Sequence, residues 1–133
     1  MAELKEGAKY KFRHTVTEPD TAAALKPITG DDFPAVFATS RCIALLELAA
    51  GRLLKAVCAP GQLSVGVVVD VKHLAATPVG AWVEAEATYT GRDGKLYVFE
   101  VVARDPGGEI MRGRHQRAVI EESRLLAGAA QRR

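Results

Sequence analysis

A single acidic residue, Glu47, lies within a long and mostly apolar stretch of the sequence, TSRCIALLELAAGRLLKAVC, from Thr39 to Cys58. At 100° per residue, the three basic residues of this stretch share one narrow stripe, and Glu47 lies about 120° from it. A helix that is apolar on most of its surface is usually buried, and a charged residue is almost never fully buried without a partner. The sequence therefore predicts a buried helix over 39–58 that carries Glu47 into a core or an interface.

The candidate partners for this carboxylate are His73, His14, His115 and the arginines. His73 continues the apolar face of the alternating run SVGVVVDVKH, so packing that face on the helix would bring it into the same layer as Glu47. A carboxylate and an imidazole in a partly dry site can work as an acid–base pair. Thr39 lies at the helix start, where its hydroxyl and the free N–H groups can hold an oxyanion or a water molecule. The set Thr39, Glu47 and His73 suits hydrolysis of an activated acyl group.

Structural roles also account for these residues, and composition and pattern alone favour them. A lone histidine on a strand is more often structural than catalytic, and a threonine at a helix start is more often an N-cap. Glu47 could equally pair with an arginine across a dimer interface. We interpret the remaining histidines and cysteines as structural, surface or small core residues: His14, His115, Cys42 and Cys58.

The pattern of the rest of the chain predicts which elements hold these side chains. Alternation of polar and apolar residues, together with turn residues, predicts strands at 8–16, 64–73, 81–90, 95–104 and 109–120. A long loop at 18–34 precedes the helix, short turns occupy 91–94 and 105–108, and 121–133 is a partly frayed tail that could form a short helix. Consecutive strands joined mainly by short turns imply an antiparallel sheet, and small residues on one face of 81–90 leave room for a helix. We expect an α+β fold.

Composition limits the class of protein. The 133 residues suit one domain, 48% hydrophobic residues are typical of a globular chain, and a net charge of +2 does not indicate a nucleic-acid partner. No stretch of about 18 apolar residues predicts a membrane span, and the first residues lack the apolar core of a signal peptide. The two cysteines are separated by about 24 Å of helix, too far for a disulfide. A cytoplasmic protein is expected, and the excess apolar surface of the helix predicts a homodimer.

Several segments resemble a known family. FPAVFAT precedes the helix, ALLELAA lies within it, and SVGVVVDVKHLAATPVGAWVEAEAT and FEVVARDPGGEIMRGRHQRAVI follow. Over about residues 33–119 the chain is similar to hot-dog-fold acyl-CoA thioesterases of the fluoroacetyl-CoA-thioesterase-like group, and HLAATPVG (73–80) is the most specific match. This resemblance implies a single hot-dog domain (1–133), a five-stranded antiparallel sheet wrapped around one long central helix.

The resemblance also implies roles for individual residues. In that group a threonine, a glutamate eight residues later and a histidine 26 residues after that form the catalytic set, and Thr39, Glu47 and His73 have this spacing. Gly66 matches a glycine near the thioester carbonyl, and Arg117 matches an arginine on the last strand that could hold Glu47 or a CoA oxygen. Phe33 resembles a lid residue over the acyl pocket, although a buried loop anchor explains it as well.

The implied reaction is hydrolysis of a short-chain or polar acyl-CoA to the free acid and CoA, with no cofactor beyond the CoA of the substrate and no metal. Glu47 and His73 activate water, or Glu47 attacks the carbonyl itself. The alternatives are a non-catalytic acyl-CoA-binding domain and a hot-dog hydratase or dehydratase. The hydratase reading is weakened because Asp70 and His73, three residues apart on a strand, face opposite sides.

Overall fold

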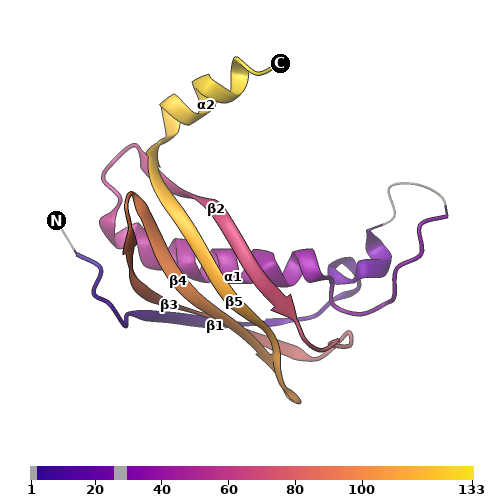
Figure 1. Cartoon of the computed structure of the whole chain (residues 1–133). Helices are drawn as coiled ribbons and strands as arrows, with labels where there is room; N and C mark the ends of the chain where they lie inside the picture. Colours follow the sequence, from indigo (N-terminus) through magenta and orange to yellow (C-terminus); the bar gives the residue numbers. More distant parts are fainter. Residues whose placement is uncertain (1–2, 26–29) are drawn as a thin grey trace.

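A five-stranded antiparallel sheet curves around one long helix (Figure 1). The computed structural model describes residues 3–25 and 30–133. The helix is α1 (Thr39–Leu54), and the strands are β1 (Lys9–Thr15), β2 (Gln62–His73), β3 (Trp82–Asp93), β4 (Leu96–Asp105) and β5 (Gly108–Glu121). Short 3₁₀ helices occupy Glu18–Asp20, Ala22–Ala24 and Lys55–Val57, and α2 (Glu122–Ala130) follows β5. With the strand order β1-β3-β4-β5-β2, the predicted α+β architecture is confirmed.

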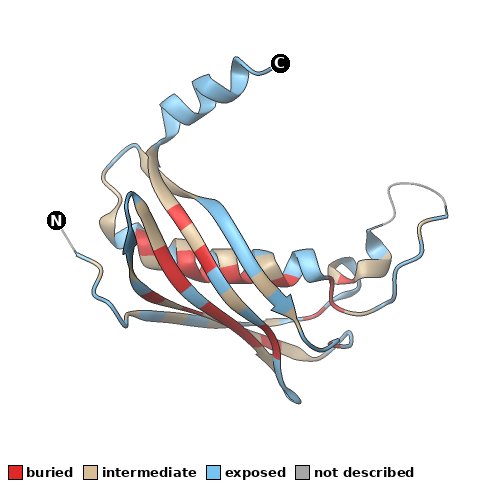
Figure 2. Ribbon diagram, in the orientation of Figure 1, coloured by how far each residue is buried: buried red, intermediate tan, exposed pale blue. Residues whose placement is uncertain are grey.

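The core lies between α1 and the concave face of the sheet (Figure 2). One face of α1 is buried through Cys42, Leu45, Leu46, Ala49, Ala50 and Leu54. The helix packs most closely on β3, where Ala85 and Ala87 are fully buried. Because alanine side chains are short, they allow the helix to approach the strand, as the sequence predicted. Larger side chains on β4, among them Phe99 and Val101, fill the space beside the helix.

The hairpin between β3 and β4 is tighter than the sequence predicted. β3 continues through the expected turn at 91–94, and only Gly94 and Lys95 connect the two strands. The ladder with β4 continues past a β-bulge between Tyr89 and Gly91, where Thr90 is the extra residue and Gly91 has a φ of +136°. The turn at 105–108 also narrows, since β4 ends at Asp105 and β5 begins at Gly108.

Strand β2 forms one edge of the sheet and departs from the predicted alternation. A bulge between Gly66 and Val68 shifts the register against β5, so the strand does not keep one continuous valine face toward the helix. Val67 and Val69 are 53% and 44% exposed, and Val68 is exposed as well. The expectation that Val65, Val67, Val69 and Val71 share one face packed on α1 was therefore wrong, although Val71 does contact the core. The middle of this edge strand presents apolar side chains to solvent.

The tail predicted at 121–133 contains the helix α2, which extends away from the sheet in Figure 1. All of its residues are exposed, including Leu125 and Leu126 (Figure 2). Its first N–H, that of Glu122, donates to the carbonyl of Gly61 and fixes the start of the helix beside β2. Within residues 3–25 and 30–133, none of the helices has the length and apolarity needed to cross a bilayer.

Candidate active site

Thr39 and His73 come together where α1 begins and β2 ends. Thr39 Oγ1 lies 2.8 Å from His73 Nδ1, a hydrogen bond between residues 34 positions apart. The alternative role of Thr39 as the N-cap was wrong, because Ala38 is the N-cap and Thr39 is the first residue of the helix. The hydroxyl of Thr39 is therefore bonded to the imidazole and leaves the helix N–H groups to other acceptors.

The other imidazole nitrogen of His73 is a buried polar atom. Among the described residues Nε2 has no hydrogen-bond partner, although it is shielded from solvent. Beside it lies a cavity of about 430 Å³, lined by Phe33, Phe37 and Thr39 among others. Phe37 is buried and Phe33 is 46% exposed, so Phe33 lies at the cavity rim rather than anchoring the loop in the core. Of the long loop predicted at 18–34, residues 26–29 lie outside the described part of the chain.

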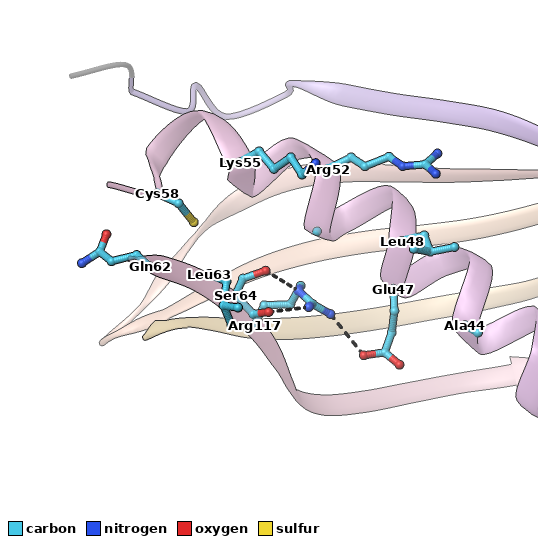
Figure 3. Close-up of a pocket in the computed structure, with 11 residues that line it drawn as sticks. Ala44, Glu47, Leu48, Arg52, Lys55, Cys58, Gln62, Leu63, Ser64 and Arg117 are labelled. Carbon is cyan, nitrogen blue, oxygen red and sulfur yellow. Dashed lines mark hydrogen bonds and ion pairs between the residues drawn. The ribbon is translucent and has the colours of Figure 1, made fainter. Parts of the chain in front are cut away.

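Within the chain Glu47 does not pair with His73 but with Arg117, the arginine that the family resemblance suggested could hold it. Glu47 Oε2 lies 3.1 Å from Nη1 of Arg117, with which it forms an ion pair (Figure 3). Thr39 and Glu47 are separated by eight helical residues, about 12 Å along the axis. The structure thus joins Glu47 to Arg117 on β5, whereas His73 joins Thr39. The Glu47 side chain is also 40% exposed, so of the two predicted surroundings the core of the chain was wrong, and an interface stays a prediction.

The guanidinium of Arg117 contacts Ser64 and His115 in addition to Glu47. Its Nε donates to Ser64 Oγ at 2.9 Å and its Nη2 donates to the Ser64 carbonyl at 3.0 Å. Its Nη1 also lies 3.1 Å from Nε2 of His115. The guanidinium is only about one-tenth exposed, and Figure 3 shows it between β2 and the Glu47 carboxylate. A buried arginine with this many partners has a fixed direction.

Gly66 lies directly under the Glu47 carboxylate. A Cβ at this position would stand 2.5 Å from Glu47 Oε2 and 3.3 Å from Cε1 of His115. The absence of a side chain is therefore what allows the carboxylate and the β2 backbone to approach each other. Gly66 therefore adjoins Glu47, and its contact with the thioester carbonyl stays a prediction.

His115 belongs to this site, although the sequence led us to interpret it as a structural or surface residue after considering it as a partner for Glu47. It is buried on β5, and its Nδ1 lies 2.8 Å from the carbonyl of Val68 in the β2 bulge. Burial lowers its pKa, and the positive charge of Arg117 lowers it further, while the Val68 carbonyl and Glu47 act in the opposite direction. A signal was present in the sequence, because His115 and Arg117 are two residues apart on one strand and must share a face.

Glu47 lines a cavity of about 740 Å³ between the second half of α1 and the start of β2 (Figure 3). Leu48 and Leu63 give it apolar walls, and Arg52 and Lys55 lie among its lining residues. Cys58 also lines it and is only partly buried, so the expectation of a small core residue holds for Cys42 alone. In the described residues no cluster of three histidine, cysteine or acidic side chains could hold a metal ion.

The chain has clear relatives. Residues 16–123 match the family described as fluoroacetyl-CoA-specific thioesterase. The fluoroacetyl-CoA thioesterase of Streptantibioticus cattleyicolor is 33% identical over 135 residues, which cover 97% of each chain. A solved structure of the fluoroacetyl-CoA thioesterase FlK is 31% identical, covers 99% of both chains and superposes with a TM-score of 0.94.

A more distant protein shares the fold. A hypothetical protein of Thermus thermophilus from the thioesterase superfamily is 23% identical, covers 98% of this chain and 94% of its own, and has a TM-score of 0.86. At this identity the likeness concerns the arrangement of helix and sheet only. The chain therefore belongs to the fluoroacetyl-CoA-specific thioesterase family and is an acyl-CoA thioester hydrolase with the hot-dog fold.

Proposed function

We propose that the chain hydrolyses short-chain acyl-CoA thioesters to the free acid and CoA, with Thr39, Glu47 and His73 as the catalytic set. The observation that carries this proposal is the 2.8 Å bond between Thr39 Oγ1 and His73 Nδ1 beside a cavity with Phe33 at its rim. Phenylalanines beside such a small cavity suit a short acyl group. Variants of the relative FlK have been solved in complex with fluoroacetate and CoA and with acetyl-CoA, which supports the same substrate class.

The reaction consumes one water molecule and breaks the C–S bond. In one route Glu47 removes a proton from water, the oxygen attacks the carbonyl, and the proton passes to the departing CoA thiolate. In the other route the carboxylate of Glu47 attacks the carbonyl and expels CoA, and water then hydrolyses the anhydride. In both routes the Gly66 N–H polarises the carbonyl oxygen, while Thr39 and His73 position the water. A single turnover in H₂¹⁸O leaves ¹⁸O in the Glu47 carboxylate only by the second route.

We further propose that two copies of the chain complete each site. Within one chain Glu47 lies about two helical turns from the Thr39–His73 pair, too far for a direct contact. The edge strand β2 exposes Val67 and Val69 and offers an unpaired backbone, which a second copy can cover by antiparallel pairing. This homodimer brings the two α1 helices side by side, so that Glu47 of one copy faces Thr39 and His73 of the other.

Two variants test the catalytic set. Glu47→Gln and His73→Ala should each lower kcat for acetyl-CoA about 10²-fold or more, measured by release of the CoA thiol. The matched controls are Glu84→Gln and His14→Gln, whose ion pairs lie on other parts of the chain, and both should keep wild-type turnover. Activity within a few-fold of wild type in either site variant would remove that residue from the set. An enoyl-CoA that gains water without thiol release would favour a hydratase instead.

Mixing the two inactive variants tests the shared site. In a dimer of one Glu47→Gln chain and one His73→Ala chain, one site carries both changes and the other carries neither. Random exchange of chains should therefore restore about a quarter of wild-type activity. No recovery after verified exchange would place Glu47 and His73 of one site in the same chain. A monomer by light scattering at micromolar concentration would refute the dimer.

A further inference from the structure

The guanidinium of Arg117 reaches Glu47 from a fixed position, and His115 supplies part of that fixation. Nη1 of Arg117 lies 3.1 Å from Glu47 Oε2 and also 3.1 Å from His115 Nε2. An arginine only donates hydrogen bonds, so the nitrogen of His115 that faces it must accept. The two N–H groups of Nη1 are thus divided between one carboxylate oxygen and one imidazole nitrogen.

The tautomer of His115 follows from its two partners. The Val68 carbonyl only accepts, so Nδ1, 2.8 Å away, must carry the proton. Nε2 then has the lone pair that Arg117 needs. An imidazole protonated at both nitrogens would turn an N–H toward Arg117, and the guanidinium would lose this acceptor and be repelled. Only the neutral Nδ1–H form is compatible with Arg117 in its observed place.

We infer that His115 is a positioning residue for the thioesterase reaction, whose Nε2 lone pair holds Arg117 in the orientation that places the Glu47 carboxylate over Gly66. This inference rests on the proposed catalytic role of Glu47. The imidazole does not need to touch the substrate, because it acts through the guanidinium. Its anchor is the Val68 carbonyl in the β2 bulge, so the irregular backbone beside Gly66 and the side chains above it form one hydrogen-bonded unit.

The surroundings of His115 separate this role from simple core packing. Its neighbours in the ladder, Val69 on β2 and Phe99 on β4, are uncharged. The charged groups that face it are Arg117 on its own strand and Glu47 on α1. An apolar residue of similar size would fill the same space at less cost than a buried imidazole. The hydrogen bonds to the carbonyl and the guanidinium are what the histidine adds.

Substitution of His115 by asparagine or by glutamine separates the roles of its two imidazole nitrogens. Asparagine reaches about the place of Nδ1 and keeps the donor to Val68, whereas glutamine reaches about the place of Nε2 and keeps the acceptor for Arg117. His115→Asn should lower kcat about tenfold with KM little changed, and His115→Gln should stay within about threefold of wild type. Thermal unfolding checks that both variants are folded. Equal kcat losses in the two variants, or none in His115→Asn, would overturn the inference.

A double-mutant cycle tests whether His115 acts through Arg117. In an Arg117→Met background, His115→Asn should cause no further loss of kcat, whereas a loss equal to that in the wild-type background contradicts the inference. The outcome is separable from the proposed function, because a fully active Glu47→Gln variant refutes the role of Glu47. An inactive Glu47→Gln variant with a fully active His115→Asn variant refutes the role of His115 alone.

A measurement without turnover completes the test. The ¹⁵N shifts of the His115 ring at pH 7.5 should show a protonated Nδ1 and an unprotonated Nε2, and Arg117→Met should shift the Nε2 signal. An imidazolium, or the Nε2–H tautomer, would overturn the inference whatever the kinetics show.

Discussion

Substitution of Gly66 by alanine should separate activity from stability in this protein. The φ of Gly66 lies outside the positive range, so alanine can adopt the same backbone conformation. The new Cβ would stand 2.5 Å from Glu47 Oε2, whereas ordinary van der Waals contact begins at 3.4 Å. The carboxylate must therefore withdraw by about 0.9 Å. The 3.3 Å approach to His115 needs only a small adjustment of the ring.

The energetic cost of this withdrawal is small. Glu47 is 40% exposed and its carboxylate can turn into the cavity, which lengthens the 3.1 Å contact with Arg117 beyond hydrogen-bonding range. Loss of a partly exposed ion pair costs about 0.5–1 kcal/mol. Replacing glycine by alanine in an allowed conformation stabilises the folded protein by about 0.4–1 kcal/mol, because alanine lowers the conformational entropy of the unfolded chain. The free energy of unfolding should thus change by less than about 1 kcal/mol.

Because Glu47 is the proposed base or nucleophile, the effect on turnover should be large. A displacement of about 1 Å in a reacting group can reduce the rate of the chemical step about 10²-fold. The assay is thiol release from acetyl-CoA at saturating substrate, with urea unfolding of the same samples. Gly128→Ala is the matched control, because a Cβ there meets nothing within 4 Å, and it should leave kcat unchanged and add up to about 1 kcal/mol of stability.

Two results would refute this reasoning. A Gly66→Ala enzyme that keeps kcat within about threefold of wild type would show that the position of the Glu47 carboxylate over Gly66 does not matter for catalysis. A loss of stability well above 2 kcal/mol would show that the β2 backbone, rather than the glutamate, takes up the clash.

The elements of the fold could be predicted from the sequence because their signals are local. Alternation and small residues identified β3 and the helix that packs on it, and turn residues identified the hairpins. The β2 bulge could not be predicted, because its one extra residue depends on pairing with β5, which is distant in the sequence. That bulge exposed the valines that the alternation had assigned to the core.

The sequence indicated which residues could belong to the site, but it did not indicate which of them contact one another. Thr39, Glu47 and His73 were singled out by residue type and by their match to the spacing in the family that the sequence resembles, yet a helix and a strand that cross can bring only some of their residues together. The structure pairs His73 with Thr39 and Glu47 with Arg117. His115 was assigned a structural or surface role because a lone histidine carries no pairing information of its own; only the β5 register places it beside Arg117.

Three further predictions concern titration and reactivity. Burial raises the pKa of the Cys42 thiol to about 12, so a thiol reagent at pH 8 should leave Cys42 unmodified until urea unfolds the chain; rapid native modification would contradict its burial. Burial raises the pKa of Asp20, but hydrogen bonds from His14 and Thr17 outweigh it and the net pKa is lowered, so the stabilisation is present above pH 3.8 and lost on acidification below it; Asp20→Asn should cost about 1 kcal/mol at pH 7 by urea unfolding. Because burial lowers the pKa of His115 below 6.5, the unfolded chain binds more protons than the folded one at acidic pH. The contribution of His115 to the free energy of unfolding should therefore be fully present above about pH 7 and decline below pH 6.5. The decline is at most about 1.4 kcal/mol for each unit by which folding lowers the pKa of His115. His115→Gln should flatten this decline, and an unchanged slope in that variant would assign the proton uptake to another group.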